Sequence, residues 1–369
     1  MRDSDDEFSY FTRSHIFAGL LVVAFGWGSI WVVSQGIDVA FDASNSSNTA
    51  AVISMNTATD SNATTMVDAS PSQTPSLSQT SSPLKNNSEV TIIIGGDVMF
   101  DRGIRAQEGR NGFDQLASVT PLFKSADVAI VNLEGPITSN RSKTLLPNGR
   151  TTKELVFTFP PSAAKAMSDA GIDAVNIANN HTDNFGLTGL TESKKWLDSV
   201  GIRFFGDPWN ASTSEAIFTK DGPKIALVGY HAFQPGFQRI VSRVKELSDK
   251  GDFVIVMPHW GNEYATSSSA AMKSQARSLV AAGAGAIVGS HPHVIMDHVW
   301  MGNVPVFYSI GNLLFDQYFS PDVMKGNIVE LHLVSDTRQG HIARLEVYET
   351  SMASRHGPTV SDQPIYTEP

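Results

Sequence analysis

The sequence predicts an α/β domain that begins near residue 89 and ends near residue 350. Short apolar runs alternate along this part of the chain with stretches that have helical periodicity. The runs are apolar throughout, which is typical of sheet strands that are covered on both faces. Plausible amphipathic helices lie between several of the runs. We therefore expect an α/β fold in which helices pack against sheet strands.

The expected elements follow one another in order. The strands are expected at residues 90–96, 127–133, 173–179, 202–206, 224–230, 253–258, 285–290 and 304–309. The helices are expected near residues 162–170, 187–200 and 270–282. Two later runs, 327–334 and 341–349, alternate more between apolar and polar residues, which predicts antiparallel strands near an edge. Residues 351–369 are expected to form a flexible tail.

The composition excludes several classes of function. The 369 residues carry a formal net charge of −10, which argues against a nucleic-acid-binding protein that neutralises phosphates. The chain has no cysteine, so disulfides, thiolate metal sites and cysteine nucleophiles are excluded. Neither a P-loop motif nor the G-x-S-x-G motif of a nucleophile elbow occurs in the sequence.

The N-terminal part predicts a membrane anchor over residues 16–36. Its central run, Ile16–Val33, contains no charged residue. A helix of this length spans roughly 27 Å, which is close to the thickness of a bilayer core. A cleavable signal peptide is the alternative, but no convincing small-x-small cleavage site follows the run. We therefore expect an uncleaved anchor.

The charges around this run predict its orientation. Arg2 and Arg13 precede it, and no further lysine or arginine occurs before Lys85. Positive residues mark the cytoplasmic side, so residues 1–15 are expected in the cytoplasm and the C-terminal domain outside it, as in a single-pass protein of the cell membrane. Residues 37–88 are rich in Ser and Thr and poor in large apolar side chains, so we expect a disordered tether rather than a small extra domain.

Polar side chains follow most of the expected strands, at the point where each strand ends. In open α/β sheets, ligands bind beyond the carboxyl ends of the strands. Each residue alone has a simpler explanation, such as a helix cap for Asp97 or a turn for Asn180. Their recurrence at successive strand ends predicts one shared site. The set comprises Asp97, Asn132, Glu134, Asn179, Asn180, His181, Asp183, His259, Glu263, His291, His293 and Asn312.

These side chains have the chemistry of a metal site. Carboxylates, carbonyl oxygens and neutral imidazoles suit divalent Mn, Zn or Fe. Two such ions, about 3.5–4 Å apart, need a bridging carboxylate and further ligands on each side. Pro292 biases His291 towards an extended backbone, which would project His291 and His293 to the same side. We therefore interpret the H-P-H segment as a pair of ligands.

Six motifs in one order carry a resemblance to a known family. The motifs are "GGDVMF", "NLEGP", "NIANNHTDNFG", "PHWGNEY", "GSHPHV" and "YSIGNLLFDQ". In this order they resemble the CapA-type poly-γ-glutamate capsule biosynthesis proteins, which look like a branch of the calcineurin-like metallophosphoesterase superfamily. The resemblance covers about residues 90–345. It implies a four-layer αββα sandwich of the metallo-dependent phosphatase type over residues 89–350.

The resemblance also implies a part for each motif residue. His181 would match the histidine that protonates the leaving group, and Glu134 would stand where the superfamily has its bridging aspartate. Asn132 and Asn312, at the same strand ends, are the candidate substrate-binding residues. The implied ligands of one or two divalent metal ions are Asp97, Glu134, Asn180, His259, His291 and His293.

One position departs from the superfamily pattern. The first motif usually reads D-x-H, but Met99 occupies its third position here. One metal therefore loses an imidazole ligand, and its binding is in doubt. The replacement of aspartate by Glu134 is a milder change that adds about one methylene of reach.

The resemblance implies a metal-dependent hydrolase of capsule biosynthesis, anchored in the cell membrane. Its partners would be an anionic surface polymer or its precursor and other capsule-synthesis membrane proteins, and not nucleic acid. A non-catalytic, polymer-binding scaffold with a degenerate metal site is the first alternative, and Met99 favours it. The retained Asn180–His181 pair favours the enzyme, because binding alone needs no proton donor. A general extracytoplasmic phosphoesterase is a further alternative.

Overall fold

The structure is a computed structural model that describes residues 89–109, 112–209, 215–219, 223–334 and 340–368. The expected cytoplasmic N-terminus, membrane anchor and tether lie outside these residues. Within the described ranges, no helix combines the length and the apolar character needed to cross a bilayer. The anchor and its orientation therefore stay predictions.

One sheet contains the strand that begins the domain. Its strands are β1 (Glu89–Val98), β2 (Val128–Leu133), β3 (Ala174–Asn176), β4 (Arg203–Phe205), β11 (Asn312–Leu314), β12 (Lys325–Val334), β13 (His341–Ser351), β14 (Thr359–Val360) and β15 (Tyr366–Glu368). The main path of this nine-stranded sheet runs β14-β13-β12-β1-β2-β3-β4, with β11 paired to β1 and β15 paired to β13. Strand β1 is parallel to β2 and antiparallel to β12, so it lies inside the sheet.

A second sheet holds the remaining strands. They are β5 (Glu215–Thr219), β6 (Lys224–His231), β7 (Phe253–His259), β8 (Ala284–Val288), β9 (His298–Met301) and β10 (Val304–Phe307). The order in this six-stranded sheet is β5-β6-β7-β8-β10-β9. Strands β6, β7, β8 and β10 are parallel, and β5 and β9 run antiparallel to their neighbours.

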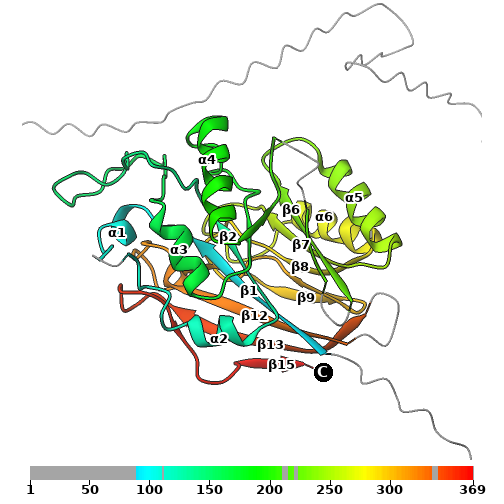
Figure 1. Cartoon of the computed structure of the whole chain (residues 1–369). Helices are drawn as coiled ribbons and strands as arrows, with labels where there is room; N and C mark the ends of the chain where they lie inside the picture. Colours follow the sequence, from blue (N-terminus) through cyan, green and yellow to red (C-terminus); the bar gives the residue numbers. More distant parts are fainter. Residues whose placement is uncertain (1–88, 110–111, 210–214, 220–222, 335–339, 369) are drawn as a thin grey trace, which may run out of the picture. The chain divides into compact units, whose positions relative to one another are not determined.

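Helices cover the outer faces of the two sheets. They are α1 (Arg102–Arg105), α2 (Thr120–Ser125), α3 (Ser162–Asp169), α4 (Gly186–Ser199), α5 (Phe237–Asp249) and α6 (Ala270–Ala281). Buried side chains of α2, α3 and α4 share one hydrophobic cluster with the nine-stranded sheet, and those of α5 and α6 share another with the six-stranded sheet. A third cluster contains residues of both sheets. Figure 1 shows α5 and α6 beside β6, β7 and β8, away from β1. The layers are thus helix, sheet, sheet, helix, and the predicted α/β class is confirmed.

Strand β1 shows why the apolar runs do not alternate. Ile93 packs in the outer cluster with α2 and α3, whereas Ile92 and Ile94 pack between the two sheets. All three side chains are fully buried. Because both faces of the strand are covered, the successive positions 92–94 are all apolar and do not alternate with polar residues.

The expected strands and helices are present, with ends that differ by a few residues. The two late runs form the antiparallel pair β12 and β13, as predicted. The elements that the sequence did not predict are α1, α2, α5, β5, β9 and β11, besides the two in the tail. Helix α5 is amphipathic, since Val244 and Leu247 are buried and Phe237, Ile240 and Val241 pack against the same cluster, so its helical periodicity was present in the sequence and was missed.

The C-terminal residues differ from the prediction. A flexible tail was expected over residues 351–369, but β14 and β15 both pair with β13. The pairing of Tyr366 with Val347 lies over the cluster between the sheets, against which the Tyr366 ring packs. The prediction of a loose tail is wrong for these two segments, because each extends a sheet edge that would otherwise lack a partner.

Glycine allows the end of β1 to approach β11 closely. A Cβ atom at Gly96 would lie 2.0 Å from the carbonyl oxygen of Gly311. The next residue, Asp97, donates its backbone N–H to that same carbonyl at 3.1 Å and lies in register with Asn312. Only glycine fits at position 96, and this contact fixes the position of the Asp97 backbone.

Candidate metal centre

The carboxyl ends of β1, β2, β7 and β8 bring most of the predicted site residues together. Asp97 lies near the end of β1, in register with Asn132 of β2. Glu134 follows the end of β2, and His259 is the last residue of β7. Ser290, just beyond β8, forms a parallel bridge with His259. The predicted shared site therefore exists as a geometric cluster.

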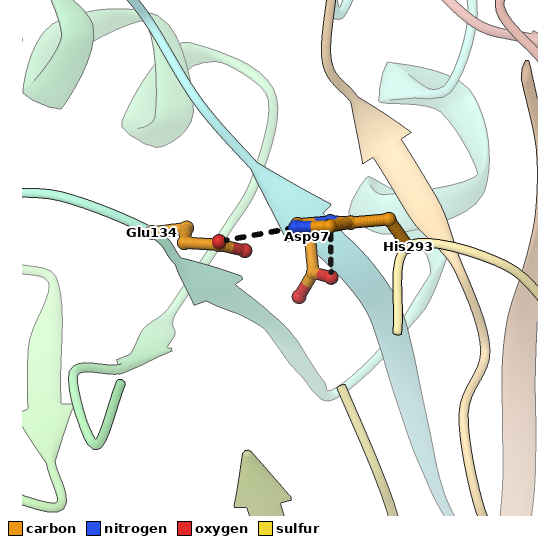
Figure 2. A group of neighbouring side chains, drawn as sticks. All are labelled: Asp97, Glu134 and His293. Carbon is orange, nitrogen blue, oxygen red and sulfur yellow. Dashed lines mark ion pairs between the residues drawn. The ribbon is translucent and has the colours of Figure 1, made fainter. Parts of the chain in front are cut away.

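Asp97, Glu134 and His293 form a compact group of possible metal ligands. One ligand atom from each lies within 4.8 Å of the others. His293 Nδ1 is 3.3 Å from Asp97 Oδ2, and His293 Nε2 is 3.4 Å from Glu134 Oε1. Figure 2 shows the imidazole paired with both carboxylates. We call these three residues the triad.

Burial and charge together set the protonation of the triad. Burial raises the pKa of Glu134 well above its ordinary value, and the charge of His293 only partly opposes this. Burial alone would lower the pKa of His293, but Glu134 and Asp97 outweigh it and raise that pKa to about 9. The triad therefore retains a proton at neutral pH until a metal ion displaces it.

The triad fits a divalent metal ion. Glu134 Oε1 and Oε2 are both buried, and neither has a hydrogen-bond partner among the described residues. An unsatisfied buried polar group costs about 1–3 kcal/mol, and more if it is charged. Two carboxylates and an imidazole are ligands that Mn, Zn and Fe accept. The predicted affinity for divalent metal is supported, whereas the identity and the number of ions stay predictions.

Asn180, His259 and His291 form a second group beside the triad. His259 Nε2 lies 2.8 Å from Asn180 Oδ1, and its ring centroid lies 4.8 Å from that of His291. Burial lowers the pKa of His291 to about 4 and holds that of His259 well below its ordinary value. His291 Nδ1 is buried without a hydrogen-bond partner among the described residues. Neutral imidazoles are the form that binds metal, so this group is available for a second ion.

The backbone of the H-P-H segment differs from the prediction. An extended conformation was expected at His291, but φ is 97° at His291 and 58° at His293. The backbone N–H of His291 lies 3.3 Å from Asp97 Oδ2, which holds this turn against the triad. This contact with Asp97 thus outweighs the preference for an extended backbone at His291 that Pro292 imposes. Both rings still enter the cluster, with centroids 6.1 Å apart.

His181 lies at the edge of the triad. Its Nε2 is 3.9 Å from Glu134 Oε1, and the Phe157 ring stacks on it at 4.3 Å. Burial lowers the pKa of His181 to about 4, although the hydrogen bond to Asn184 opposes this. His181 is therefore uncharged at neutral pH.

Asn132 and Asn312 were predicted to bind substrate, but they contact the ligands of the triad. Asn132 is fully buried, and its Nδ2 donates to Asp97 Oδ1 at 2.8 Å. Asn312 is 1% exposed, and its Oδ1 lies 3.0 Å from His293 Nδ1. Its Nδ2 donates to the backbone carbonyl of Val323 at 2.9 Å. These contacts leave neither amide for a substrate, so both residues orient the ligands instead.

Met99 does not lie among the ligands. Its side chain is fully buried in the outer hydrophobic cluster, and its Sδ accepts the backbone N–H of Asp101 at 3.0 Å. The nearby Asp101 is also engaged, because its two carboxylate oxygens accept the backbone N–H groups of Arg102 and Thr158. Asp101 caps helix α1 and does not compensate for the missing ligand.

Arg102 is a residue near the site that sequence reasoning missed. Its guanidinium pairs with Asp316 and lies 5.0 Å from the Phe157 ring centroid and 5.4 Å from that of Phe315. Its φ is 48°, in the left-handed region that non-glycine residues rarely adopt. The sequence offered one signal, an arginine directly after the "GGDVMFD" segment. Burial raises the pKa of Glu134, and the charge of Arg102 opposes this rise in small part, so Arg102 contributes positive potential to the site.

Comparisons with known proteins agree with the resemblance. The chain is 28% identical to the capsule biosynthesis protein CapA of Bacillus anthracis over 255 residues, which are 63% of this chain and 61% of that protein. It is 26% identical to the PGA biosynthesis protein CapA of Bacillus subtilis over 297 residues, which are 74% of this chain and 76% of that protein. The chain thus spans only about three fifths of the Bacillus anthracis relative.

A solved structure and a family match complete the comparisons. The calcineurin-like phosphoesterase YfkN from Bacillus subtilis aligns with a TM-score of 0.47 and 15% identity, over 75% of this chain and 93% of that one. The family described as bacterial capsule synthesis protein PGA_cap matches residues 91–317, which include all the ligands of both groups. This match covers more than half of the chain, and the chain belongs to the PGA_cap family of bacterial capsule synthesis proteins.

Proposed function

We propose that this chain is a membrane-anchored, extracytoplasmic hydrolase that cleaves bonds in an anionic capsule polymer, poly-γ-glutamate or a similar chain, or in its precursor. The family and the names of the relatives support the link to capsule synthesis. The helix, sheet, sheet, helix order supports a sandwich of the metallo-dependent phosphatase type. The observation that carries the proposal is the buried Glu134 carboxylate, which lacks hydrogen bonds and lies next to both His293 and His181.

The chain offers ligands for one ion or two. The triad would hold one divalent ion, and Asn180, His259 and His291 would contribute to a second. A divalent ion in such a site polarises the bond to be broken and lowers the pKa of water. The proton transfers of the reaction would be carried out by protein side chains.

His181 is placed to move one proton. Asn184 Oδ1 accepts the backbone N–H of Phe157 at 2.7 Å and lies 3.1 Å from His181 Nδ1. Because that oxygen can only accept, the neutral imidazole carries its proton on Nδ1 and leaves Nε2 free to accept one. His181 can therefore take a proton at Nε2 from the attacking water and return it to the leaving group. Phe157 stacks on the ring and shields this transfer from bulk solvent.

The test separates a hydrolase from a scaffold. His181→Asn should keep its metal content, because His181 is in neither ligand group. It should lose about 10²–10⁴-fold in turnover of a γ-linked glutamate oligomer or an activated phosphodiester. His298→Asn, on strand β9, is the matched control and should keep full activity. The metal content of each variant is measured by elemental analysis, and its fold by circular dichroism.

Three outcomes have distinct meanings. Capsule formation at the normal level in cells that carry His181→Asn would show that the chain acts as a non-catalytic binding module and not as a hydrolase. Cleavage of the phosphodiester without cleavage of the γ-linked oligomer would indicate a general phosphoesterase. Cleavage of the oligomer that depends on both metal and His181 would support the proposal.

A further inference from the structure

A cavity adjoins the metal centre at the same edge of the two sheets. It has a volume of about 120 Å³ and lies between the loop after β4, the end of β6 and the first turns of α5. Strand β4 is the neighbour of β3, which leads into Asn180, and β6 is the neighbour of β7, which ends at His259. The cavity is therefore one strand away from the ligands in each sheet, where a bound polymer would extend.

His231 forms the wall between the cavity and the metal centre. It ends β6 in register with His259, and the two ring centroids are 6.5 Å apart. Its Nδ1 is buried and has no hydrogen-bond partner among the described residues. A ligand in the cavity would supply a partner for a polar atom that the protein leaves unsatisfied.

The cavity has more positive than negative charge. Arg239 and Arg243 line it from the first two turns of α5. Arg243 pairs with Glu246, but Arg239 has no carboxylate within ion-pair distance in the described part of the chain. Asp207 also lines the cavity, and Lys194 pairs with it.

The N-terminus of α5 adds donors on the same side. Gly236 is the N-cap residue of this 13-residue helix and has no side chain to cap it, although its carbonyl accepts the N–H groups of Arg239 and Ile240. The Arg239 guanidinium folds back over this end, since a Cβ at Gly236 would lie 2.6 Å from its Nη2. The Arg239 cation and the positive end of α5, which has no side-chain cap, thus meet at one wall of the cavity, and this arrangement suits an anion.

We propose that this cavity binds one carboxylate-bearing unit of the acidic polymer, next to the unit whose bond is cleaved. The inference rests on the proposed function and names its subsite. One uncompensated arginine matches a singly charged carboxylate better than a dianionic phosphate. The side chains of Tyr230 and Ile240 line the cavity and suit the methylene arm of such a unit. The volume of about 120 Å³ has room for the short arm of such a unit.

Equilibrium binding tests the inference without turnover. The probes are a γ-linked tri-glutamate with free α-carboxylates, its α-amide counterpart and inorganic phosphate, each titrated into the protein by calorimetry. We expect the unmodified chain to prefer the acid over the amide. Arg239→Gln should weaken binding of the acid by roughly 10- to 100-fold, because a hydrogen bond to a charged group is lost, and should leave binding of the amide unchanged. Arg277→Gln, exposed on α6, is the matched control and should keep the preference.

Three outcomes would overturn the subsite, and a fourth separates it from the proposed function. Equal binding of acid and amide by the unmodified chain would exclude a carboxylate-binding cavity. If Arg239→Gln still prefers the acid over the amide, the carboxylate binds elsewhere on the protein. The proposed hydrolase function would be unaffected. Binding of phosphate that depends on Arg239, without a preference for the acid, would assign the cavity to phosphate. If the chain cleaves no γ-linked oligomer but Arg239 still determines the preference, the proposed function fails and the subsite stands.

Discussion

His293 Nε2 lies 3.4 Å from Glu134 Oε1, and both side chains are almost completely withdrawn from solvent. The pair retains a proton, because burial raises the pKa of Glu134 and the carboxylates raise that of His293 to about 9. A divalent ion has to displace this proton before it can bind both side chains. Metal binding is therefore coupled to pH.

The first prediction concerns this coupling. Binding of Zn²⁺ at pH 7 should release about one proton per ion. The metal affinity should rise with pH until the pKa of His293, about 9, is passed. Calorimetric titration in two buffers with different ionisation enthalpies measures the released proton. Equal binding heats in both buffers would contradict the prediction.

The second prediction concerns the residue that orients His293. Asn312→Ala removes the oxygen 3.0 Å from His293 Nδ1 and frees the ring to rotate. The metal affinity should fall by about 10–100-fold, as is usual for an outer partner of a ligand. His293→Ala, which removes the ligand itself, should lose more than that. His298→Ala is the control, and competition with a chelator measures all three affinities. An unchanged affinity in Asn312→Ala would mean that the ring is held by other contacts.

The third prediction concerns Met99. Because its side chain is fully buried in the outer cluster, Met99→Leu should change the free energy of unfolding by less than about 1.5 kcal/mol. Met99→His should lower it by about 1–3 kcal/mol, since it buries a polar ring in an apolar cluster. Urea denaturation of the metal-free protein measures both values. If Met99→His keeps full stability and binds additional metal, the imidazole reaches the site and the superfamily pattern can be restored.

The fourth prediction concerns pH and stability. Burial lowers the pKa of His231 from 6.5 to about 4, so between these values the unfolded chain binds a proton that the folded chain excludes. The contribution of His231 to stability is complete above pH 6.5 and is lost as the pH falls towards 4. His231→Gln should therefore make the unfolding free energy less dependent on pH in this window, by at most about 2 kcal/mol between pH 7 and pH 5. Urea denaturation of the metal-free variant and of the metal-free unmodified chain measures this dependence. Identical pH profiles of the unfolding free energy would contradict the lowered pKa of His231.

The fifth prediction concerns the anchor, which lies outside the described residues. The uncharged run Ile16–Val33 should keep the full-length chain in the membrane fraction. Protease added to intact protoplasts should release a fragment that begins within residues 37–88, because these residues would be exposed outside the cell. Immunoblotting of the fractions detects the fragment. Recovery of the full-length chain in the soluble cytosol would end this proposal.

The sequence predicted the fold where burial determines composition. Strands β1, β2 and β7 are covered on both faces, and their apolar runs are unambiguous. Short edge strands carry no such signal, because β9 and β14 are not enclosed in this way. The tail around Tyr366 is ordered by its pairing with β13, a long-range contact that no local pattern in residues 351–369 indicates.

The sequence also predicted which residues meet but not how they are held. Asp97, Glu134 and His293 were expected together because each follows a strand end. The backbone at His291 could not be predicted, since tertiary contacts override the preference set by Pro292. The neutral state of His181 depends on burial under Phe157, a residue distant in sequence that no motif links to it.

The position of β1 has a consequence for how the protein is made. Strand β1 is synthesised at the start of the domain, yet one of its neighbours, β12, is among the last strands to be synthesised. Until then, one edge of β1 has no partner and can pair with the edge of another chain. Asp97 and Glu134 are also in place long before His293 has been made. A metal ion can therefore bind the triad only after residue 293 has been translated, and a chain truncated before β12 would carry all three triad residues on an incomplete sheet.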